Sequence, residues 1–584
     1  MSQPLSQFAR RKALVIVLAA AAPLAIRALL LLWMPLPNPR VQDEFAHLLV
    51  ADTFAHGRAV NPVHPMWAHF ESMHILVRPV YASAFPVGQG IAMAAGSVIF
   101  GHPWAGVWLG MAAMCAATSW MLYGWLPPRW ALLGTAIVVV RFSVLSYWMN
   151  SYFGGALAAA GGALALGALP RLRIRRRWQD AAWFAAGVAI LGNTRPYEGA
   201  LLAVPLMMAL AWMLRQGNRR TEVVLPIALI LGATGAAMMA YCARVTGNPL
   251  QLPYAFYRAN FTMAPHFVFQ SPRPARRYLH RVLREFHTVS EMGCYNDARA
   301  NRAPHGLASK AVSYWRFYLG PVLTLPLLAL PWILRRRRVL IFLALAAIFM
   351  AGLAVEVWHA PHYAAPFLGV AMLLVIEGLR YVEAIAGRWT VRLIAAAFLL
   401  APVIGGSSTE TNGAPRARVL AQLQSIGGQH LVIVRYARLH DVGDEWVYNA
   451  ADIDRAPVVW AREMDPVSNQ ELVQYFAGRR VWLLEPDRAP PALTPYDRAN
   501  APDPPFGFVK PGTPEITVLR SADGVRARMR AAASDAARSC DEWNYIFTHT
   551  IGVEAPDPAN GCFTAGARDA PVPFERWFAW LESR

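Results

Sequence analysis

Charged residues are scarce in this chain, which has 584 residues of which only 16% are charged and 56% are hydrophobic. Soluble domains usually carry about a quarter charged residues. The shortfall therefore argues against a soluble protein, but it is uneven along the chain. Residues 13–405 hold long apolar runs, whereas residues 406–584 have the composition of an ordinary polar domain. We expect a membrane module over residues 1–406 and a soluble domain over residues 407–584.

Cysteine is also rare, with five residues in the whole chain. Cys115 and Cys242 lie in apolar segments, where cysteine is expected to act as a packing residue. Cys294 falls in a long loop. Cys540 and Cys562 lie in the polar tail, and an extracytoplasmic tail would allow them to form a disulfide. Two cysteines alone do not establish that bond, so both states stay open.

Acidic residues are fewer than basic ones, with 36 against 55 and a formal net charge of +19. The arginines gather between apolar runs, at 171–177, 215–220 and 335–338. Cytoplasmic loops of membrane proteins have this pattern. The basic balance is therefore assigned to membrane topology, and no nucleic-acid partner is expected.

Eleven segments are apolar enough to be membrane helices, which need about 20 such residues. They are 13–36, 104–125, 129–147, 153–170, 179–193, 197–214, 222–243, 315–334, 339–357, 364–382 and 390–406. Segment 86–101 is shorter and contains Pro86, Gly88 and Gly90. If 86–101 spanned the membrane, the arginines at 171–177 would lie outside, so we expect it to be re-entrant or interfacial. The N-terminus is then cytoplasmic, and outer loops 37–103 and 244–314 and the tail lie outside.

The tail shows short β patterns at 430–436, 457–464 and 480–485, with a helical pattern at 469–476. This alternation predicts a small α/β domain. No glycine-rich phosphate loop is present in it, and residues 486–515 are rich in proline and expected to be irregular. The predicted fold is thus a polytopic α-helical membrane protein with a C-terminal extracytoplasmic α/β domain.

Asp43 and Glu44 come shortly after the first apolar segment. At a membrane interface, low-dielectric surroundings raise the pKa of a carboxyl group, and one of the two could deprotonate an acceptor hydroxyl. The alternative is helix capping, with Asp43 as the N-cap and Glu44 in the first turn. The two roles are compatible.

Histidines are frequent in the same loop, at positions 47, 56, 64, 69 and 74, together with Glu71. Histidine and carboxylate side chains can bind a divalent metal. No two of them have a tight ligand spacing within one helix, so a hydrated, aromatic-rich interface is the favoured interpretation. No cofactor is firmly expected, and a divalent metal stays an open alternative.

The first outer loop also carries Tyr81, Phe85-Pro86 and Gly88-Gln89-Gly90 before the short apolar segment. With the Asp43–Glu44 pair, this arrangement resembles the GT-C membrane glycosyltransferases, in particular the protein O-mannosyltransferase and aminoarabinose-transferase group. The resemblance covers about residues 10–380. It implies a polyprenyl-phosphate sugar donor, an acidic residue in the first outer loop that acts as a base, and cationic residues that hold the donor phosphate. Asp43 is then the candidate base and Glu44 its neighbour.

Further candidates for donor phosphate or substrate binding lie at charged or polar positions among the apolar segments. Arg141 lies inside one of them, where charge is costly and marks function, unless the side chain reaches the interface instead. Arg195 and Glu198 flank Pro196, where the helix is expected to break, and they could equally form a structural pair. The remaining candidates are Tyr152, His359, His362 and Tyr363. The 358–366 segment resembles a patch near the carrier phosphate in the family, although an aromatic belt with a tight turn is the other interpretation.

The predicted function is transfer of a sugar from a polyprenyl-phosphate donor to a protein, lipid or glycan acceptor on the periplasmic face of a bacterial inner membrane. Asp43 would take the acceptor proton, and Arg195, His362 or Arg141 would hold the leaving phosphate. The alternative from another class is a transporter or flippase of lipid-linked precursors. Transporters tend to show repeated halves, and no internal repeat is evident here. A membrane anchor with a sensing domain, or a ligase of lipid-linked glycans, are further alternatives.

Overall fold

The computed structural model describes residues 3–215, 220–274, 278–404, 414–437, 440–496, 543 and 576–577. The chain divides into two compact units. The first comprises Met1–Val63, Met73–Pro274 and Glu291–Ala417, and the second joins His64–Ser72 and Ala275–Ser290 to the chain from Arg418 onward. Cys540 and Cys562 lie outside the described residues.

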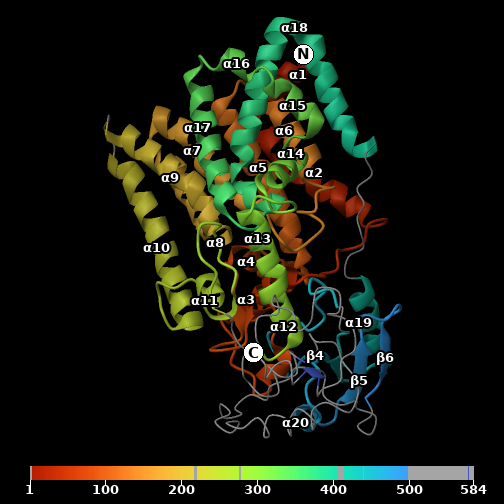
Figure 1. The fold of residues 1–584 in the computed structure, drawn as a ribbon. Coiled ribbons are helices and arrows are strands. Elements are labelled where there is room, and N and C mark those ends of the chain that lie inside the picture. The colour runs from red at the N-terminus through yellow and green to blue at the C-terminus, as the bar shows by residue number, and fades with distance from the viewer. Residues whose placement is uncertain are drawn as a thin grey trace. The chain divides into compact units, whose positions relative to one another are not determined.

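The first unit is built from helices (Figure 1). Long or apolar helices are α2 (Lys12–Leu30), α5 (Trp104–Trp125), α6 (Pro128–Phe142), α7 (Ala156–Arg175), α8 (Trp178–Thr194), α9 (Pro196–Arg215), α10 (Arg220–Thr246), α17 (Arg337–Val355) and α18 (Leu368–Ile404). Shorter elements are α1 (Gln3–Arg10), α3 (Gln42–Ala55), α4 (Gly88–Phe100), α11 (Pro253–Phe261), α13 (Glu291–Arg299), α14 (Leu307–Tyr318), α15 (Gly320–Leu327), α16 (Leu330–Ile333) and the 3-10 helix η3 (Pro361–Phe367). Strands β1 (Ile75–Leu76) and β2 (Ala82–Ser83) pair antiparallel.

Seven helices among the described residues are long and apolar enough to cross a membrane, and a bent pair would make an eighth. The chain is therefore a polytopic helical membrane protein. The predicted count of eleven is higher because α6 and α8 have 15 and 17 residues, and because α18 joins segments 364–382 and 390–406, which are two helices on either side of a break at Gly387. Segment 86–101 contains the 13-residue helix α4, which is too short to span.

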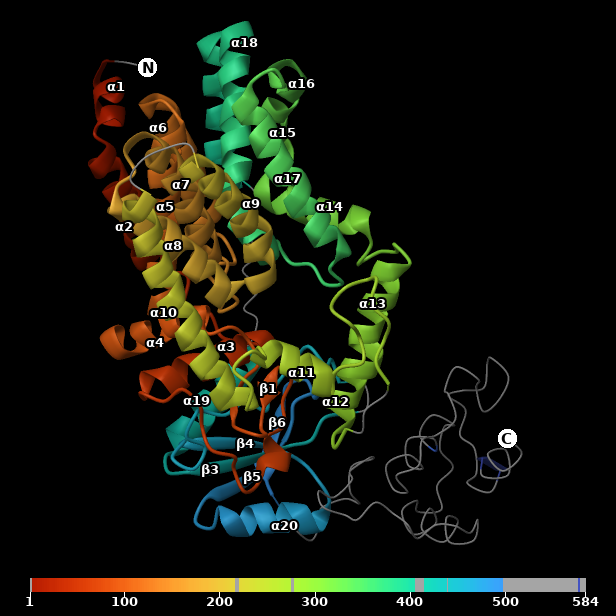
Figure 2. The same ribbon diagram turned by 90° about the vertical axis from the view of Figure 1, so that its left-hand side faces the viewer.

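The predicted span 315–334 is not one straight helix. The axes of α14 and α15–α16 differ by 94°, and Figure 2 shows the change of direction between the two. The break lies at Gly320, whose φ of 59° is in the left-handed region. Glycine adopts this conformation without the steric cost that a Cβ imposes, and Pro321 next to it removes a backbone donor.

Small residues let the central helices of the first unit approach closely. At Gly162 in α7, an added Cβ would lie 2.2 Å from the carbonyl oxygen of Pro366 in η3. A side chain at this position would therefore force η3 away from α7. The close contact fixes the short segment that carries His362 and Tyr363.

The second unit contains a four-stranded mixed sheet with strand order β4-β3-β5-β6. Strands β3 (His430–Val434), β4 (Val458–Arg462) and β5 (Arg480–Glu485) are parallel, and β6 (Ala492–Pro495) runs antiparallel to β5. Helix α20 (Pro466–Tyr475) connects β4 to β5, and the Asp465 side chain caps its N-terminus. The three predicted strands and the helix are thus present. The prediction of an irregular segment from 486 was wrong at β6, because proline is tolerated on an edge strand.

Three further elements complete the second unit, namely η1 (Trp67–Phe70), α12 (Arg281–Glu285) and the π-helix η2 (Phe286–Ser290). Helix α19 (Ala414–Ile426) leads into β3. The buried residues Val432, Val434, Trp446, Trp460 and Leu484 form the core beneath the sheet. The outer-loop segments thus fold with the tail, although the sequence predicted only a division at residue 406.

Candidate functional site

Helix α3 places the two adjacent carboxylates in different surroundings. Glu44 Oε2 accepts hydrogen bonds from the backbone N–H groups of Arg40 (3.0 Å) and Val41 (3.4 Å), and its Oε1 accepts from Tyr152 N–H (3.1 Å). Burial raises the pKa of Glu44 against the opposing effect of these hydrogen bonds. Val41 is the N-cap residue. The alternative of helix capping predicted Asp43 as the N-cap, which was wrong. Glu44, in the first turn, accepts the hydrogen bonds of the backbone N–H groups at the start of the helix.

Asp43 points instead to His74, whose Nδ1 lies 2.8 Å from Asp43 Oδ1. Burial would raise the pKa of Asp43, but the contact with His74 and the positive charge of Arg195 outweigh it, so the pKa lies below its ordinary value. Asp43 is consequently ionised at neutral pH. A half-buried, ionised carboxylate that is not used as a helix cap is suited to accept a proton or to stabilise positive charge.

His47 stacks on Phe85, with ring centroids 5.0 Å apart. Burial, together with the positive charge of Arg195, lowers the pKa of His47 to about 4. His47 is therefore neutral at pH 7. It lies one helical turn after Asp43, so the two side chains share one face of α3.

Arg195 occupies the break between α8 and α9, where Pro196 begins the second helix. Its guanidinium lies 4.5 Å from the centroid of the Tyr363 ring and 3.7 Å from Glu198 Oε1. The charge of Arg195 acts on Asp43, His47, Glu356 and His362. The half-buried Arg195 thus faces groups from three parts of the chain, namely α3, the end of α17 and η3.

The η3 segment supplies His362 and Tyr363 to the same region. His362 Nδ1 is hydrogen-bonded to the hydroxyl group of Tyr147 at 2.9 Å, and the His362 backbone N–H donates to the same hydroxyl at 2.9 Å. The His362 ring also stacks on Phe153, with centroids 5.5 Å apart. These contacts fix the imidazole beside Arg195.

Glu356 is a member of this group that the sequence interpretation missed. It follows α17 directly, is 2% exposed, and its Oε1 lies 3.1 Å from His266 Nε2. Burial raises the pKa of Glu356 to about 8 although Arg195 and Lys310 oppose the shift. Burial lowers the pKa of His266 to about 4. A carboxyl group at the end of an apolar run, two residues before Trp358, was the available signal.

A buried ion pair supports the loop that carries His266. Arg258 contacts Glu291, and the Arg258 guanidinium lies 4.3 Å from the Trp358 ring centroid. Arg258 also donates to the carbonyl oxygen of Ala264. Both charged side chains are nearly inaccessible, so the pair holds α11, α13 and the segment after α17 together.

The other predicted residues lie in different contacts. Arg141 donates to the carbonyl oxygen of Arg316 at 2.5 Å. The Tyr152 hydroxyl donates to the carbonyl oxygen of Pro37 at 3.0 Å. The His359 ring lies 5.5 Å from that of His305 and 6.4 Å from that of Tyr314. The structure thus brings Asp43, Arg195, Glu198, His362 and Tyr363 into one electrostatic neighbourhood, whereas the Tyr152 backbone N–H donates to Glu44, the residue next to Asp43.

Metal ligation was the open alternative for the histidine-rich loop. Within the part of the chain that the structure describes, no three His, Cys, Asp or Glu side chains gather as potential ligands of one metal ion. His64 and His69 fold with the second unit, where His64 contacts Asp454 at 3.0 Å and His69 Nδ1 bonds to the Arg462 carbonyl oxygen at 2.9 Å. His47 and His74 surround Asp43 instead.

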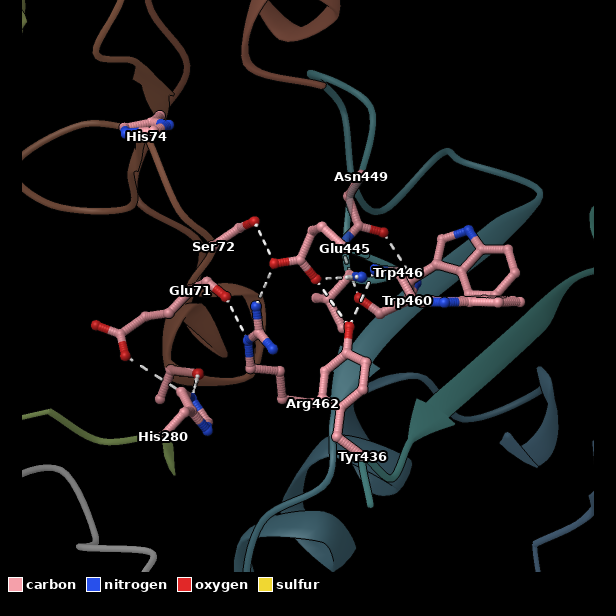
Figure 3. Close-up of polar contacts among 12 residues, drawn as sticks. Glu71, Ser72, His74, His280, Tyr436, Glu445, Trp446, Asn449, Trp460 and Arg462 are labelled. Carbon is pink, nitrogen blue, oxygen red and sulfur yellow. Dashed lines mark hydrogen bonds and ion pairs between the residues drawn. The ribbon is translucent and has the colours of Figure 1, made fainter. Parts of the chain in front are cut away.

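The second unit has a buried polar network of its own (Figure 3). Glu445 Oε2 accepts from Arg462 Nη2 at 2.6 Å and from Ser72 Oγ at 3.0 Å, and Glu445 Oε1 accepts from Tyr436 at 2.8 Å. Arg462 Nε donates to the carbonyl oxygen of Glu71 at 2.6 Å. The ion pair is closed to solvent and both oxygens of Glu445 accept hydrogen bonds, so we assign it to holding segment 64–72 against the sheet rather than to chemistry.

No family model matches the sequence, and no curated protein matches it. Solved structures of membrane glycosyltransferases of the GT-C type are similar to this chain at low identity. ArnT from Cupriavidus metallidurans in the apo state is 12% identical, with a TM-score of 0.47 over 81% of this chain and 92% of ArnT. The Archaeoglobus fulgidus oligosaccharyltransferase with Zn and sulfate is 10% identical, with a TM-score of 0.40 over 81% of this chain and 67% of its own.

A second structure of the archaeal enzyme, AglB in complex with an inhibitory peptide and a dolichol-phosphate, has a TM-score of 0.39 at 10% identity, over 81% of this chain and 69% of its own. These likenesses concern the general course of the chain. At such TM-scores they assign no residue and no reaction to it, so the function has to be argued from the side chains described above.

Proposed function

We propose that this protein transfers a sugar from a polyprenyl-phosphate donor to an acceptor hydroxyl or amine at the outer face of a bacterial inner membrane. The observation that carries the proposal is the grouping of Asp43, Arg195, His362 and Glu356 at the ends of apolar helices. Placing charged side chains next to a bilayer costs free energy, so a cluster of them indicates a substrate site. Its chemistry matches a reaction that removes a proton and releases a phosphate.

Asp43 acts as the base in this proposal. The acceptor's lone pair forms a bond to the anomeric carbon of the sugar, the bond from that carbon to the phosphate oxygen breaks, and the acceptor proton passes to Asp43. The contact with His74 at 2.8 Å orients one carboxylate oxygen, which leaves the other for the acceptor. Direct displacement inverts the anomeric centre. A positioned base of this kind contributes about 10²–10⁴-fold to a rate.

Arg195 stabilises the leaving polyprenyl phosphate. Negative charge develops on that phosphate as the sugar departs, and a preorganised cation in a low-dielectric site stabilises it most effectively. The nearest acidic partner, Glu198, is 3.7 Å away, which is longer than a tight ion pair. His362 and Tyr363, beside the guanidinium, complete the phosphate site. For Arg141 we propose a contact with the same donor, farther from the sugar than the contacts of Arg195.

Glu356 keeps the charge of Arg195 available. Its pKa of about 8 means that Glu356 is mostly protonated at neutral pH and does not neutralise the guanidinium. A phosphate that enters the site therefore meets a net positive field. When the pH rises through 8, Glu356 ionises and competes with the phosphate for Arg195.

The topology belongs to the same proposal. The seven helices, the bent pair, α6, α8 and the second part of α18 correspond one to one to the eleven predicted segments. We propose a cytoplasmic N-terminus, with loops 37–103 and 244–314 and the domain from residue 407 in the periplasm. A periplasmic reporter fused after residue 175 should be inactive, whereas an active one would contradict this orientation.

Donor turnover tests the function. Membranes containing the full-length protein are incubated with polyprenyl-phosphate sugars radiolabelled in the sugar and with envelope extracts as acceptors. We expect release of label from the carrier, and at least a tenfold loss of this activity in Arg195→Gln. Arg129→Gln is the control, because Arg129 is a half-exposed arginine that pairs with Glu383 at 2.7 Å. Equal activity of wild type, Arg195→Gln and a vector control would refute the proposal.

A further inference from the structure

A second charged cluster lies in the first unit, at the N-terminal end of α17, and it takes no part in the proposed reaction. Glu377 in α18 is 0% exposed and contacts three guanidinium groups. Arg336 Nη1 lies 3.2 Å from Oε2, Arg338 Nε lies 3.2 Å from Oε1, and Arg380 Nη1 lies 2.8 Å from Oε1. We call Arg336, Arg338, Arg380 and Glu377 the arginine cluster.

The charge of this cluster is not balanced by its own members. Three guanidinium groups face one carboxylate, which leaves two positive charges. The neighbouring Arg335 and Arg337 side chains are exposed and add more. An arginine excess by itself follows from membrane topology. Membrane topology does not explain why a buried carboxylate gathers three arginine side chains at one point, because the charge rule requires only that the arginines lie on one side of the membrane.

The cluster remains accessible from outside the helix bundle. The side chains of Arg336 and Arg338 are 40% and 37% exposed, so each guanidinium has donors that face away from Glu377. Exposed apolar side chains lie on both sides in sequence, with Trp332 at 66% and Ile341 at 55%. Tryptophan at such a position is typical of the headgroup level of a membrane. An anion with an apolar tail fits this combination.

The cluster and the candidate site lie at opposite ends of α17. The helix begins at Arg337 and ends at Val355, one residue before Glu356. Nineteen residues span about 28 Å, close to the roughly 30 Å thickness of a hydrocarbon core. A ligand of the arginine cluster therefore belongs to the leaflet opposite the proposed sugar transfer.

We infer that the arginine cluster binds the phosphate of an anionic phospholipid, with the acyl chains along Trp332 and Ile341. Basic pockets between membrane helices bind such headgroups through charge-assisted hydrogen bonds. Glu377 keeps the guanidinium groups together in the absence of lipid. The inference does not depend on the proposed sugar transfer.

Lipid retention measures this binding. Full-length protein is reconstituted in nanodiscs of phosphatidylcholine with a minor fraction of phosphatidylglycerol, and the lipids that stay bound are counted by native mass spectrometry. Loss of one basic contact weakens binding by about fivefold, so Arg336→Gln with Arg338→Gln should bind phosphatidylglycerol about 25-fold more weakly. The matched control is Arg388→Gln with Arg392→Gln, which removes the same charge from exposed positions of α18.

Each outcome decides the matter. Selective loss of phosphatidylglycerol from the first double variant, with unchanged elution and thermal midpoint, supports the site. Equal loss from both double variants would show a general effect of surface charge and overturn it, as would no loss from either. Displacement of phosphatidylglycerol by added polyprenyl phosphate at one-to-one stoichiometry would assign the site to the carrier lipid instead. Arg336→Lys with Arg338→Lys, which retains the charge, should recover part of the binding and covers the case of a poorly folded glutamine variant.

Discussion

Removing Arg462 should destabilise the second unit far more than removing any surface arginine. In Arg462→Met, the Glu445 carboxylate keeps its contacts with Tyr436 and Ser72 but loses its countercharge inside the core. The side chains of Glu445 and Arg462 are 1% and 3% exposed. An uncompensated buried charge costs about 3–5 kcal/mol. Segment 64–72 also loses the hydrogen bond from Arg462 to the Glu71 carbonyl oxygen.

Hydrogen exchange of the full-length protein measures this effect in the right part of the chain. Amides of β3 and β4 exchange through opening of the sheet, so a loss of about 3–5 kcal/mol accelerates them by about 10²–10⁴-fold. Arg488→Met is the control, because Arg488 is 66% exposed and pairs with Glu485 at 3.0 Å. It should change exchange by no more than about fivefold. Adding Glu445→Gln to Arg462→Met removes the orphan charge and should restore part of the protection. Equal exchange in Arg462→Met and Arg488→Met would refute the reasoning.

Three further predictions concern the candidate site. Because the pKa of Glu356 is raised to about 8, the KM of the wild type for a polyprenyl-phosphate donor should rise as the pH rises from 7 to 9. In Glu356→Gln the KM should not change over this range. An equal rise of the KM in both proteins would exclude Glu356 as the titrating group. Gly162→Ala should displace η3 and lower turnover by about tenfold or more. Gly232→Ala is the control, because its Cβ meets no atom within 4 Å, and it should leave turnover unchanged. Equal turnover of the two variants would contradict the packing argument. Glu44→Gln keeps the shape of the helix cap and should lose less than about tenfold in activity, well short of Asp43→Asn; a loss as large as that of Asp43→Asn would show that Glu44 does more than cap α3.

The membrane helices and the strands of the tail could be predicted from the sequence. Apolar runs of about 20 residues predict membrane helices, and three short β patterns in the tail became β3, β4 and β5. The break at Gly320 was missed because a hydropathy pattern carries no backbone angle. The division between segments 364–382 and 390–406 was predicted correctly, since α18 breaks between them at Gly387, whose φ of 80° is in the left-handed region.

The candidate site could be predicted only in part, because it joins distant segments. Asp43 and Arg195 were proposed from charge beside apolar runs, and they do act on one another. No local pattern assigns His74, Glu356 and His266 to one site, because only the tertiary structure brings them close to Asp43 and Arg195. The different roles of Asp43 and Glu44 could not be predicted either, since Glu44 accepts a hydrogen bond from the Tyr152 amide 108 residues away.

The most direct test of the account is turnover of a radiolabelled polyprenyl-phosphate sugar by wild type, Asp43→Asn and Asp52→Asn. Asp52 is a second aspartate of α3 and contacts His56 at 3.2 Å, so it controls for the loss of a charge from that helix. The account predicts label transfer with wild type and Asp52→Asn, and a loss of about 10²–10⁴-fold with Asp43→Asn in protein that still folds. Undiminished transfer by Asp43→Asn would contradict the assigned base, and the absence of transfer by the wild type with every donor and acceptor would contradict sugar transfer itself.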